Sequence, residues 1–218
     1  MGLICALCKV RQCELEPGTK EPPSYCAMAS GDVDIQAILE HAEAEYKVDG
    51  ETREVALSSA RTEAEGYLRW PRVQEVMEFA WKLGVKHLGI ATCIGLIEES
   101  NRLHKILREN GFHVSSVCCK VGSISKSSVG LSPAETLAPE GGYDPMCNPV
   151  GQAELLNNAQ TDLNILVGLC VGHDSLFIRH SEALVTVLVA KDRVTGHNPV
   201  AALYTSHSYF SRLRNLHE

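Results

Sequence analysis

Between residues 86 and 190 the sequence alternates short apolar runs with longer stretches of helical periodicity. Runs of this length, rich in Val, Ile and Leu and bounded by polar or glycine residues, are typical of buried strands. The expected strands are residues 86–92, 112–118, 163–169 and 184–190, and the expected helices are residues 96–110, 152–160, 174–182 and a last one from about residue 200. Strands that alternate with helices form parallel sheets covered by helices on both faces. The sequence therefore predicts an α/β fold with a mainly parallel, four-stranded sheet of the Rossmann or flavodoxin-like type.

Two further segments precede the expected sheet. Residues 1–31 hold four cysteines with several prolines and glycines and show no helical or strand period, which indicates a loop-rich, cysteine-rich segment. Residues 32–84 contain stretches with apolar residues at helical spacing, the last of which begins near Pro71 and stops at Gly84. We therefore expect a metal-binding segment over residues 1–31, a helical segment packed on the core over 32–84, and an α/β domain over 85–218.

The chain of 218 residues contains nine cysteines, and this number bears on function. A net charge of −7 disfavours non-specific binding to nucleic acid, and no apolar run reaches the length of a membrane span. The start of the chain lacks the pattern of an export signal, so we expect a cytoplasmic protein with no membrane partner and with reduced thiols. Clustered cysteines in such proteins are more often metal-binding or catalytic than disulfide-bonded.

Four cysteines near the start follow the spacing C-x2-C-x4-C-x12-C, and they are Cys5, Cys8, Cys13 and Cys26. The first pair is a tight chelating unit, because two thiolates on one short turn reach the same ion with little loop-closure cost. Four thiolates complete either a tetrahedral zinc shell or the ligand set of an iron–sulfur cluster. The segment is therefore predicted to be a metal site, and the alternative is a set of unconnected surface thiols.

Four more cysteines lie at or just after the expected strands or before a helix, and they are Cys93, Cys119, Cys147 and Cys170. In an open parallel sheet the carboxyl ends of the strands line the functional crevice, so these thiols are expected to converge there. Cys118 precedes Cys119, and strand alternation sends the two side chains to opposite faces. The expectation is a second metal or thiol site, although a single cysteine is by default a small buried hydrophobe.

Three polar residues near the same edge are candidates for catalysis. His173 and Asp174 follow Cys170 closely, and His197 lies beyond the last expected strand. Either histidine can act as acid, base or ligand near neutral pH, and Asp174 can orient one of them. Asp174 and Asn198 are equally well explained as helix N-caps.

Several phrases of the sequence, among them CALCKVRQC, CNPVGQAELLN, GLCVGHDSLF and KDRVTGHNPVAALY, resemble a family of uncharacterised microbial proteins that are catalogued as a domain of unknown function and commonly labelled metal-binding. The resemblance covers nearly the whole chain and implies metal binding through the cysteines, with no established reaction. The idea of three cysteines at the crevice, Cys93, Cys147 and Cys170, is also similar to iron–sulfur desulfidases. In those enzymes three thiolates hold a four-iron cluster and one iron stays open for a substrate sulfur. A fourth thiolate from Cys119 would close the cluster and imply electron transfer or a structural role.

Two main hypotheses follow for function. The first is an iron–sulfur protein, with a 4Fe–4S cluster at the crevice that is catalytic or redox-active and binds a small sulfur-containing or anionic ligand. The second is a zinc-binding α/β module with structural zinc and no catalysis. The residue types satisfy both metals, and the thiolate-only crevice favours iron–sulfur. Thiol–disulfide exchange ranks last, because the C-x-x-C pair lies in the loop-rich start.

Overall fold

The computed structural model describes residues 4–29, 35–138 and 142–216, and the chain divides into two compact units, Met1–Arg61 and Thr62–Glu218. The predicted boundary between residues 31 and 32 lies outside the described residues. The first unit contains the short 3-10 turns Cys5–Leu7, Gln12–Glu14 and Ala27–Ala29, the helix α1 (Ile35–Lys47) and most of α2 (Glu51–Gly66). No helix in the described part of the chain combines the length and the apolar character needed to cross a bilayer.

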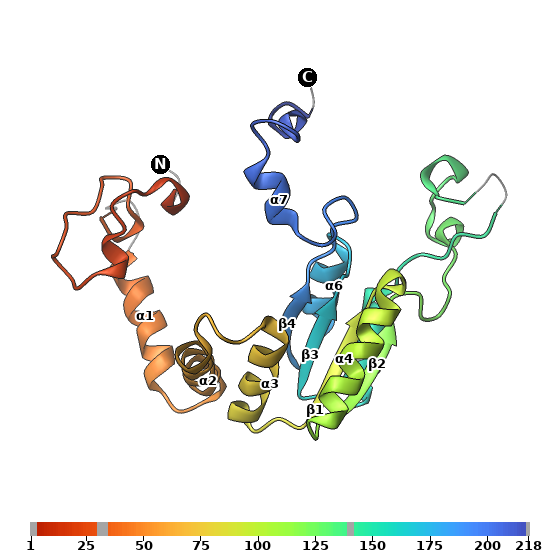
Figure 1. Cartoon of the computed structure of the whole chain (residues 1–218), viewed down its shortest axis with the longest axis horizontal. Helices are drawn as coiled ribbons and strands as arrows, with labels where there is room; N and C mark the ends of the chain where they lie inside the picture. The colour runs from red at the N-terminus through yellow and green to blue at the C-terminus, as the bar shows by residue number, and fades with distance from the viewer. Residues whose placement is uncertain (1–3, 30–34, 139–141, 217–218) are drawn as a thin grey trace. The chain divides into compact units, whose positions relative to one another are not determined.

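The second unit is the predicted α/β fold (Figure 1). Its elements, in chain order, are α3 (Arg72–Leu83), β1 (His87–Thr92), α4 (Ile97–Glu109), β2 (His113–Cys118), α5 (Pro149–Asn158), β3 (Leu163–Val167), α6 (His173–His180), β4 (Leu184–Val189) and α7 (Pro199–Tyr204). The four strands pair in parallel in the order β2-β1-β3-β4. This is the order of the first four strands in flavodoxin-like folds, so the predicted fold class is confirmed.

The predicted strands and helices differ from the observed ones by a few residues at their ends. Gly84 closes α3 in the left-handed conformation, as its position predicts. The helix expected from residue 152 begins earlier, at Pro149, because the side chain of Asn148 accepts a hydrogen bond from the amide of Gly151 at 2.9 Å and caps the helix. Asp174 does not cap α6, because the residue before the helix is Gly172.

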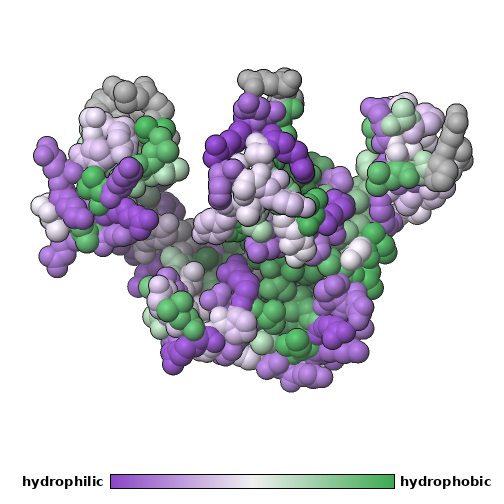
Figure 2. Space-filling model, turned by 45° about the horizontal axis from the view of Figure 1, so that its top comes forward, coloured by the Kyte–Doolittle hydropathy of each residue, from purple (hydrophilic) through white to green (hydrophobic). Residues whose placement is uncertain are grey.

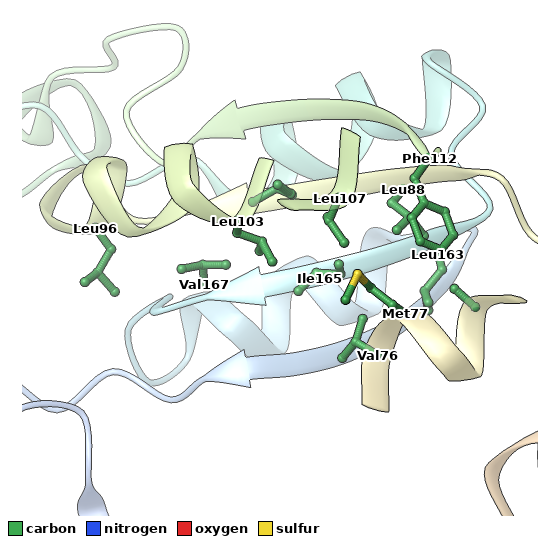
Figure 3. Packing of buried hydrophobic residues seen from close by; sticks show 12 residues of the cluster. Val76, Met77, Leu88, Leu96, Leu103, Leu107, Phe112, Leu163, Ile165 and Val167 are labelled. Atoms are coloured by element: carbon green, nitrogen blue, oxygen red, sulfur yellow. The ribbon is translucent and has the colours of Figure 1, made fainter. Parts of the chain in front are cut away.

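Helices cover both faces of the sheet, and each face has its own apolar cluster. On one face α3 and α4 pack against β1 and β3 around residues such as Met77, Leu107 and Ile165 (Figure 3). On the other face α5 and α6 bury Leu156 and Phe177. β3 is buried along its whole length, as expected for a strand with helices on both sides. The sheet is therefore the middle layer of a three-layer unit.

Gly89 in β1 marks a close approach between two central strands. It is paired with Asn164 of β3, whose buried side chain accepts a hydrogen bond from Thr161 Oγ1 at 2.8 Å and donates one to Ser181 Oγ at 2.9 Å. A Cβ atom on Gly89 would lie only 1.9 Å from Asn164 Oδ1. The absence of a side chain at this position therefore makes room for the asparagine and its hydrogen bonds.

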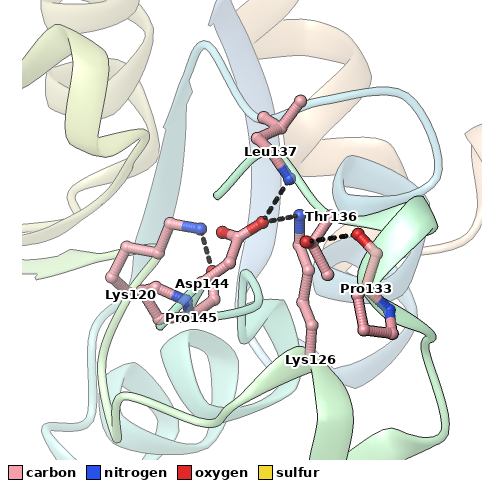
Figure 4. Close-up of polar contacts among 7 residues, drawn as sticks. All are labelled: Lys120, Lys126, Pro133, Thr136, Leu137, Asp144 and Pro145. Carbon is pink, nitrogen blue, oxygen red and sulfur yellow. Dashed lines mark hydrogen bonds and ion pairs between the residues drawn. The ribbon is translucent and has the colours of Figure 1, made fainter. Parts of the chain in front are cut away.

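The segment between β2 and α5 is held by polar contacts of its own in its described part. Lys126 Nζ and Asp144 Oδ2 lie 2.6 Å apart, and Asp144 also accepts a hydrogen bond from the amide of Leu137 at 2.8 Å (Figure 4). The pKa of Asp144 is lowered, first by the hydrogen bond from Lys126 and then by the one from Leu137. The ion pair therefore closes the base of this insertion.

Replacing Gly89 by Ala is expected to destabilise the second unit by about 1–3 kcal/mol, the usual cost of overpacking a core. The added methyl group meets Asn164 Oδ1 and the side chain of Leu156. Urea unfolding followed by circular dichroism measures the effect. Gly50→Ala is the control, because no atom lies within 4 Å of the added Cβ there. Equal unfolding midpoints for Gly89→Ala and wild type would contradict this account.

Replacing Asp144 by Asn is expected to loosen the insertion, because the amide cannot pair with the ammonium group of Lys126. Amide hydrogen exchange at Lys126 and Leu137 should become several-fold faster, with Glu154→Gln on α5 as the control. Since the pKa of Asp144 is lowered in the folded protein, its contribution is present above its ordinary pKa and is lost as the pH falls through the folded value. Protection factors, which divide out the intrinsic pH dependence of exchange, should therefore fall in wild type toward those of the variant in acid. A protection factor in wild type that does not change with pH would rule out a role for the carboxylate.

Candidate functional site

The ends of the parallel ladders fix the positions of two of the predicted cysteines. The amide of Cys93 donates to the carbonyl of Val167 at 3.0 Å, and the amide of Cys119 donates to the carbonyl of Thr92 at 2.8 Å. Both residues directly follow their strands and are buried, with 6% of Cys93 and 2% of Cys119 exposed. The sheet therefore delivers two thiols to its carboxyl edge, as the sequence predicts.

Gln152 of α5 secures this edge from the helical side. Its side chain is fully buried and donates to the carbonyl oxygens of Thr92 at 3.2 Å and of Val117 at 2.7 Å. These two carbonyl groups belong to the last residue of β1 and the second-last residue of β2. The start of α5, and with it the neighbouring Cys147, is thereby tied to the ends of two strands.

Cys93, Cys119 and Cys147 meet at this edge, and we call them the thiol cluster. The sulfur atoms of Cys119 and Cys147 are 3.8 Å apart, and the thiols of Cys93 and Cys119 are hydrogen-bonded. The amide of Ile94 also donates to Cys119 Sγ at 3.3 Å. The structure therefore brings three of the four predicted crevice cysteines into one cluster, from positions that lie 26 and 28 residues apart in sequence.

The thiol cluster holds one cysteine in a form that ionises readily. The hydrogen bond from Cys119, the amide of Gly95 and the ammonium group of Lys191 together lower the pKa of Cys93 to about 5. Lys191 Nζ lies 3.2 Å from Cys93 Sγ. The same hydrogen bond and burial raise the pKa of Cys119. Cys93 is therefore the thiolate of the pair at neutral pH, and Cys119 is its proton donor.

Cys170, the fourth predicted cysteine, lies beside an arginine. Arg193 Nη2 donates to Cys170 Sγ at 3.0 Å. The pKa of Arg193 is raised, first by this hydrogen bond, and the charges of Cys170, Cys93 and Cys147 also raise it. The guanidinium group of Arg193 thus interacts electrostatically both with Cys170 and with two members of the thiol cluster.

The three predicted catalytic residues have different surroundings. Burial and the charge of Lys120 lower the pKa of His173, while Asp174 and Cys93 raise it, so this histidine lies within the field of the site. Its Nδ1 atom is buried and has no hydrogen-bond partner among the described residues. Asp174 accepts a hydrogen bond from the amide of the next residue, Ser175, at 2.8 Å. His197 accepts one from the amide of Asp192 at 3.1 Å and so holds a turn.

Three cations at this edge were not among the residues expected from the sequence. Lys120, Lys191 and Arg193 come directly after β2 and β4 or within a few residues of them. Their position after a strand is the same signal that identified the cysteines and the candidate catalytic residues, but it was not applied to lysine and arginine in the sequence. Together with the thiol cluster, Cys170 and His173, these cations make up what we call the strand-end site.

The surface around the insertion and the C-terminal segment of the second unit is partly apolar. In Figure 2, hydrophobic colour gathers on the face between these two segments. Two residues in the loops of the strand-end site, Ile94 and Val171, are largely exposed. Apolar surroundings strengthen the interactions of the nearby charges, because they lower the local dielectric constant.

The four N-terminal cysteines line one cavity of about 300 Å³ in the first unit, and they are Cys5, Cys8, Cys13 and Cys26. The amide of Arg11 donates to Cys8 Sγ at 3.4 Å from a left-handed backbone conformation. Across the described residues, no group of three or more His, Cys, Asp or Glu side chains is already placed to hold a metal ion. The four N-terminal thiols therefore surround a shared space, and neither they nor the thiol cluster is arranged as a complete ligand shell in the described part of the chain.

Comparison with known proteins adds a family. The family model described as "Protein of unknown function (DUF1847)" matches residues 31–188. An uncharacterized protein of Methanocaldococcus jannaschii is 45% identical over 169 residues, which are 78% of this chain and 84% of the relative. No solved structure matches the chain. The long match to the family model and the high identity to this relative together show that the chain belongs to the DUF1847 family of proteins of unknown function.

Proposed function

We propose that the protein is a metal-binding protein whose strand-end site is a thiolate-ligated metal centre, held by Cys93, Cys119 and Cys147. The observation that carries this proposal is the meeting of three thiols from three separate loops. Each loop is positioned by buried backbone or amide hydrogen bonds. Chance burial of cysteine as a hydrophobe does not require three sulfur atoms to converge at the functional edge of a parallel sheet.

The chemistry of the donor set fits a metal. Metal ions bind thiolates, and the surroundings of Cys93 lower its pKa to about 5. The amide of Ile94 donates to Cys119 Sγ, a contact that stabilises a sulfur carrying negative charge. Binding of a cation would release the proton of Cys119, whose pKa is raised in the metal-free cluster. The bound metal would supply Lewis-acid or redox chemistry at this edge.

The spacing of the sulfur atoms bears on the choice of metal. Two thiolates on one tetrahedral ion with metal–sulfur bonds of about 2.3 Å are separated by about 3.8 Å. Cys119 and Cys147 have this separation, which supports a single ion such as zinc. In an iron–sulfur cluster each cysteine binds a different iron, so the ligands spread further apart.

An iron–sulfur cluster is the second candidate, and the position of Cys170 favours it. The charge of Arg193 interacts with Cys170, Cys93 and Cys147, so these three thiols share one electrostatic environment. A cluster is large enough to take ligands from Cys170 as well as from the thiol cluster. In either case His173 is the residue suited to accept a proton, because its lowered pKa keeps the imidazole neutral at neutral pH and its Nδ1 atom is unpartnered among the described residues.

We also propose a structural metal for the first unit. Cys5, Cys8, Cys13 and Cys26 line the same cavity, and the amide of Arg11 contacts Cys8 Sγ as it would in a thiolate site. The short helical turns in this segment bury few side chains. A bound ion would supply the stability that such a segment lacks.

Replacing Cys119 by Ala is expected to remove the metal of the strand-end site and to leave that of the first unit. Metal analysis and a visible spectrum of anaerobically purified full-length protein measure both quantities. Cys118→Ala is the matched control, because Cys118 is the adjacent thiol and no bond from its sulfur to the thiol cluster is seen. Loss of zinc without a change in colour would identify a single ion, and loss of broad absorption near ~400 nm with several irons would identify a cluster. Equal metal content in wild type and Cys119→Ala would overturn the proposed centre.

Replacing Cys8 by Ser is expected to have the complementary effect. The metal of the first unit should be lost while that of the strand-end site stays, and trypsin should cut within residues 4–29 at least several-fold faster, because metal-dependent segments unfold without their ion. Peptide mapping by mass spectrometry locates the cuts. A variant with unchanged metal content and unchanged cutting would rule out the structural site.

A further inference from the structure

Three cations at the strand-end site lack a carboxylate partner. Lys191 and Arg193 contact the sulfur atoms of Cys93 and Cys170, and Lys120 donates to the carbonyl oxygen of Pro145. Within the part of the chain that the structure describes, none of the three forms a salt bridge with Asp or Glu. The chain as a whole is acidic, with a net charge of −7, so the cations form a local exception.

The carboxylates nearest to these cations are engaged elsewhere. Asp144 feels the charge of Lys120, but its carboxylate is held by Lys126 and by the amide of Leu137. Asp174 binds the amide of Ser175. Asp192, which lies between Lys191 and Arg193 in sequence, accepts hydrogen bonds from the amides of Val194 and Thr195. The other facing group is His173, whose pKa is lowered first by burial and then by the charge of Lys120. Among the described residues the three cations therefore have sulfur and carbonyl partners and no carboxylate partner.

Metal binding at the thiol cluster leaves the three cations beside it. A divalent ion with three thiolates carries one net negative charge, and Lys120, Lys191 and Arg193 keep their positive charges. The helices α5 and α6 begin just after Cys147 and Cys170, and their amino-terminal ends add partial positive charge. These cations and helix ends together favour a bound anion.

We infer that the strand-end site binds a small oxyanionic group, a carboxylate or a phosphate, between Arg193 and Lys191, with Lys120 contributing from the insertion side. The guanidinium group suits this role, because its two parallel N–H donors match the oxygens of such a group. Arg193 is exposed and therefore accessible to a ligand from solvent. The inference rests on the proposed function, because the anion would lie beside the thiols of the proposed metal centre. It names the class of small molecule that would bind at that centre.

Alkylation of Cys170 by two reagents of similar shape and different charge tests this inference. Iodoacetate transfers a carboxymethyl group to the thiolate sulfur and iodoacetamide a carbamidomethyl group. In both reactions the S–C bond forms as the C–I bond breaks and iodide leaves, and only iodoacetate carries a carboxylate. The rates are measured by peptide mass spectrometry on the full chain, kept anaerobic and stripped of metal with a chelator. The ratio of the two rates cancels any change in the ionised fraction of Cys170.

In wild type the rate with iodoacetate should saturate with concentration, and the ratio at Cys170 should exceed that at the exposed Cys13. In Arg193→Gln the ratio should fall by about 3–10-fold, within the range of electrostatic effects on association. Lys105→Gln on α4, an exposed cation outside the site, is the control and should leave the ratio unchanged. A ratio that Arg193→Gln leaves unaltered, or a rate that stays linear throughout the millimolar range, would overturn the inference.

Competition identifies the oxyanion and separates this inference from the proposed metal centre. Acetate and inorganic phosphate are each added at matched ionic strength, and the anion that slows the iodoacetate reaction at Cys170 is the group that the site accepts. Protection by neither anion counts against the inference. The alkylation assay contains no metal, so it can fail while Cys119→Ala still loses its metal. Conversely, the alkylation assay can show anion binding while Cys119→Ala keeps its metal. In that case only the proposed metal centre is refuted.

Discussion

The buried amide of Gln152 is the interaction on which the strand-end site depends most. It donates to carbonyl groups at the carboxyl ends of β1 and β2 and so joins α5 to two strands at the level where the thiols lie. A fully buried amide that loses its partners carries the full cost of desolvation, about 1–3 kcal/mol for each group. This cost makes the approach of Cys147 to Cys119 specific and keeps α5 from sliding along the sheet. The apolar clusters on the two faces stabilise the fold, and Gln152 fixes the position of α5 along the ends of β1 and β2.

The electrostatics of the site follow from the same geometry. Parallel strands end at one edge, so residues that directly follow β1, β2, β3 and β4 become neighbours even though they are far apart in sequence. In this chain those positions hold thiols and cations, and two of these contacts shift a pKa. Lys191 helps to lower the pKa of Cys93, and Cys170 raises that of Arg193. An ion pair between a thiolate and a cation contributes little to the free energy of folding when solvent screens it. The arrangement is therefore better explained by a functional role of these groups.

The sequence was sufficient to predict the fold class and the parallel sheet, and it named four cysteines at the edge of the sheet, three of which form the thiol cluster. It succeeded because strand ends in a parallel sheet are fixed by hydrophobic pattern alone. It failed where a single polar contact decides the outcome. The start of α5 depends on the side chain of Asn148, and the pairing of Arg193 with Cys170 depends on the path of a loop. The Asn-Pro signature that correctly placed the start of α7 also occurs at Asn148-Pro149, so the earlier start of α5 could have been predicted by the same rule.

The two groups of cysteines differ in how much of the chain must be ordered before their members can meet. The first group spans residues 5–26, so its loop closes early and locally, before most of the chain has left the ribosome. The second group draws on residues 93, 119 and 147 and needs β1, β2 and the start of α5 in register, so it forms only when the sheet does. Any ion that binds there adds its binding free energy to the cooperative stability of the whole sheet, because it binds the folded state alone. Metal supply would thus set the lifetime of the folded second unit, whereas at the first group it would govern only a short terminal segment.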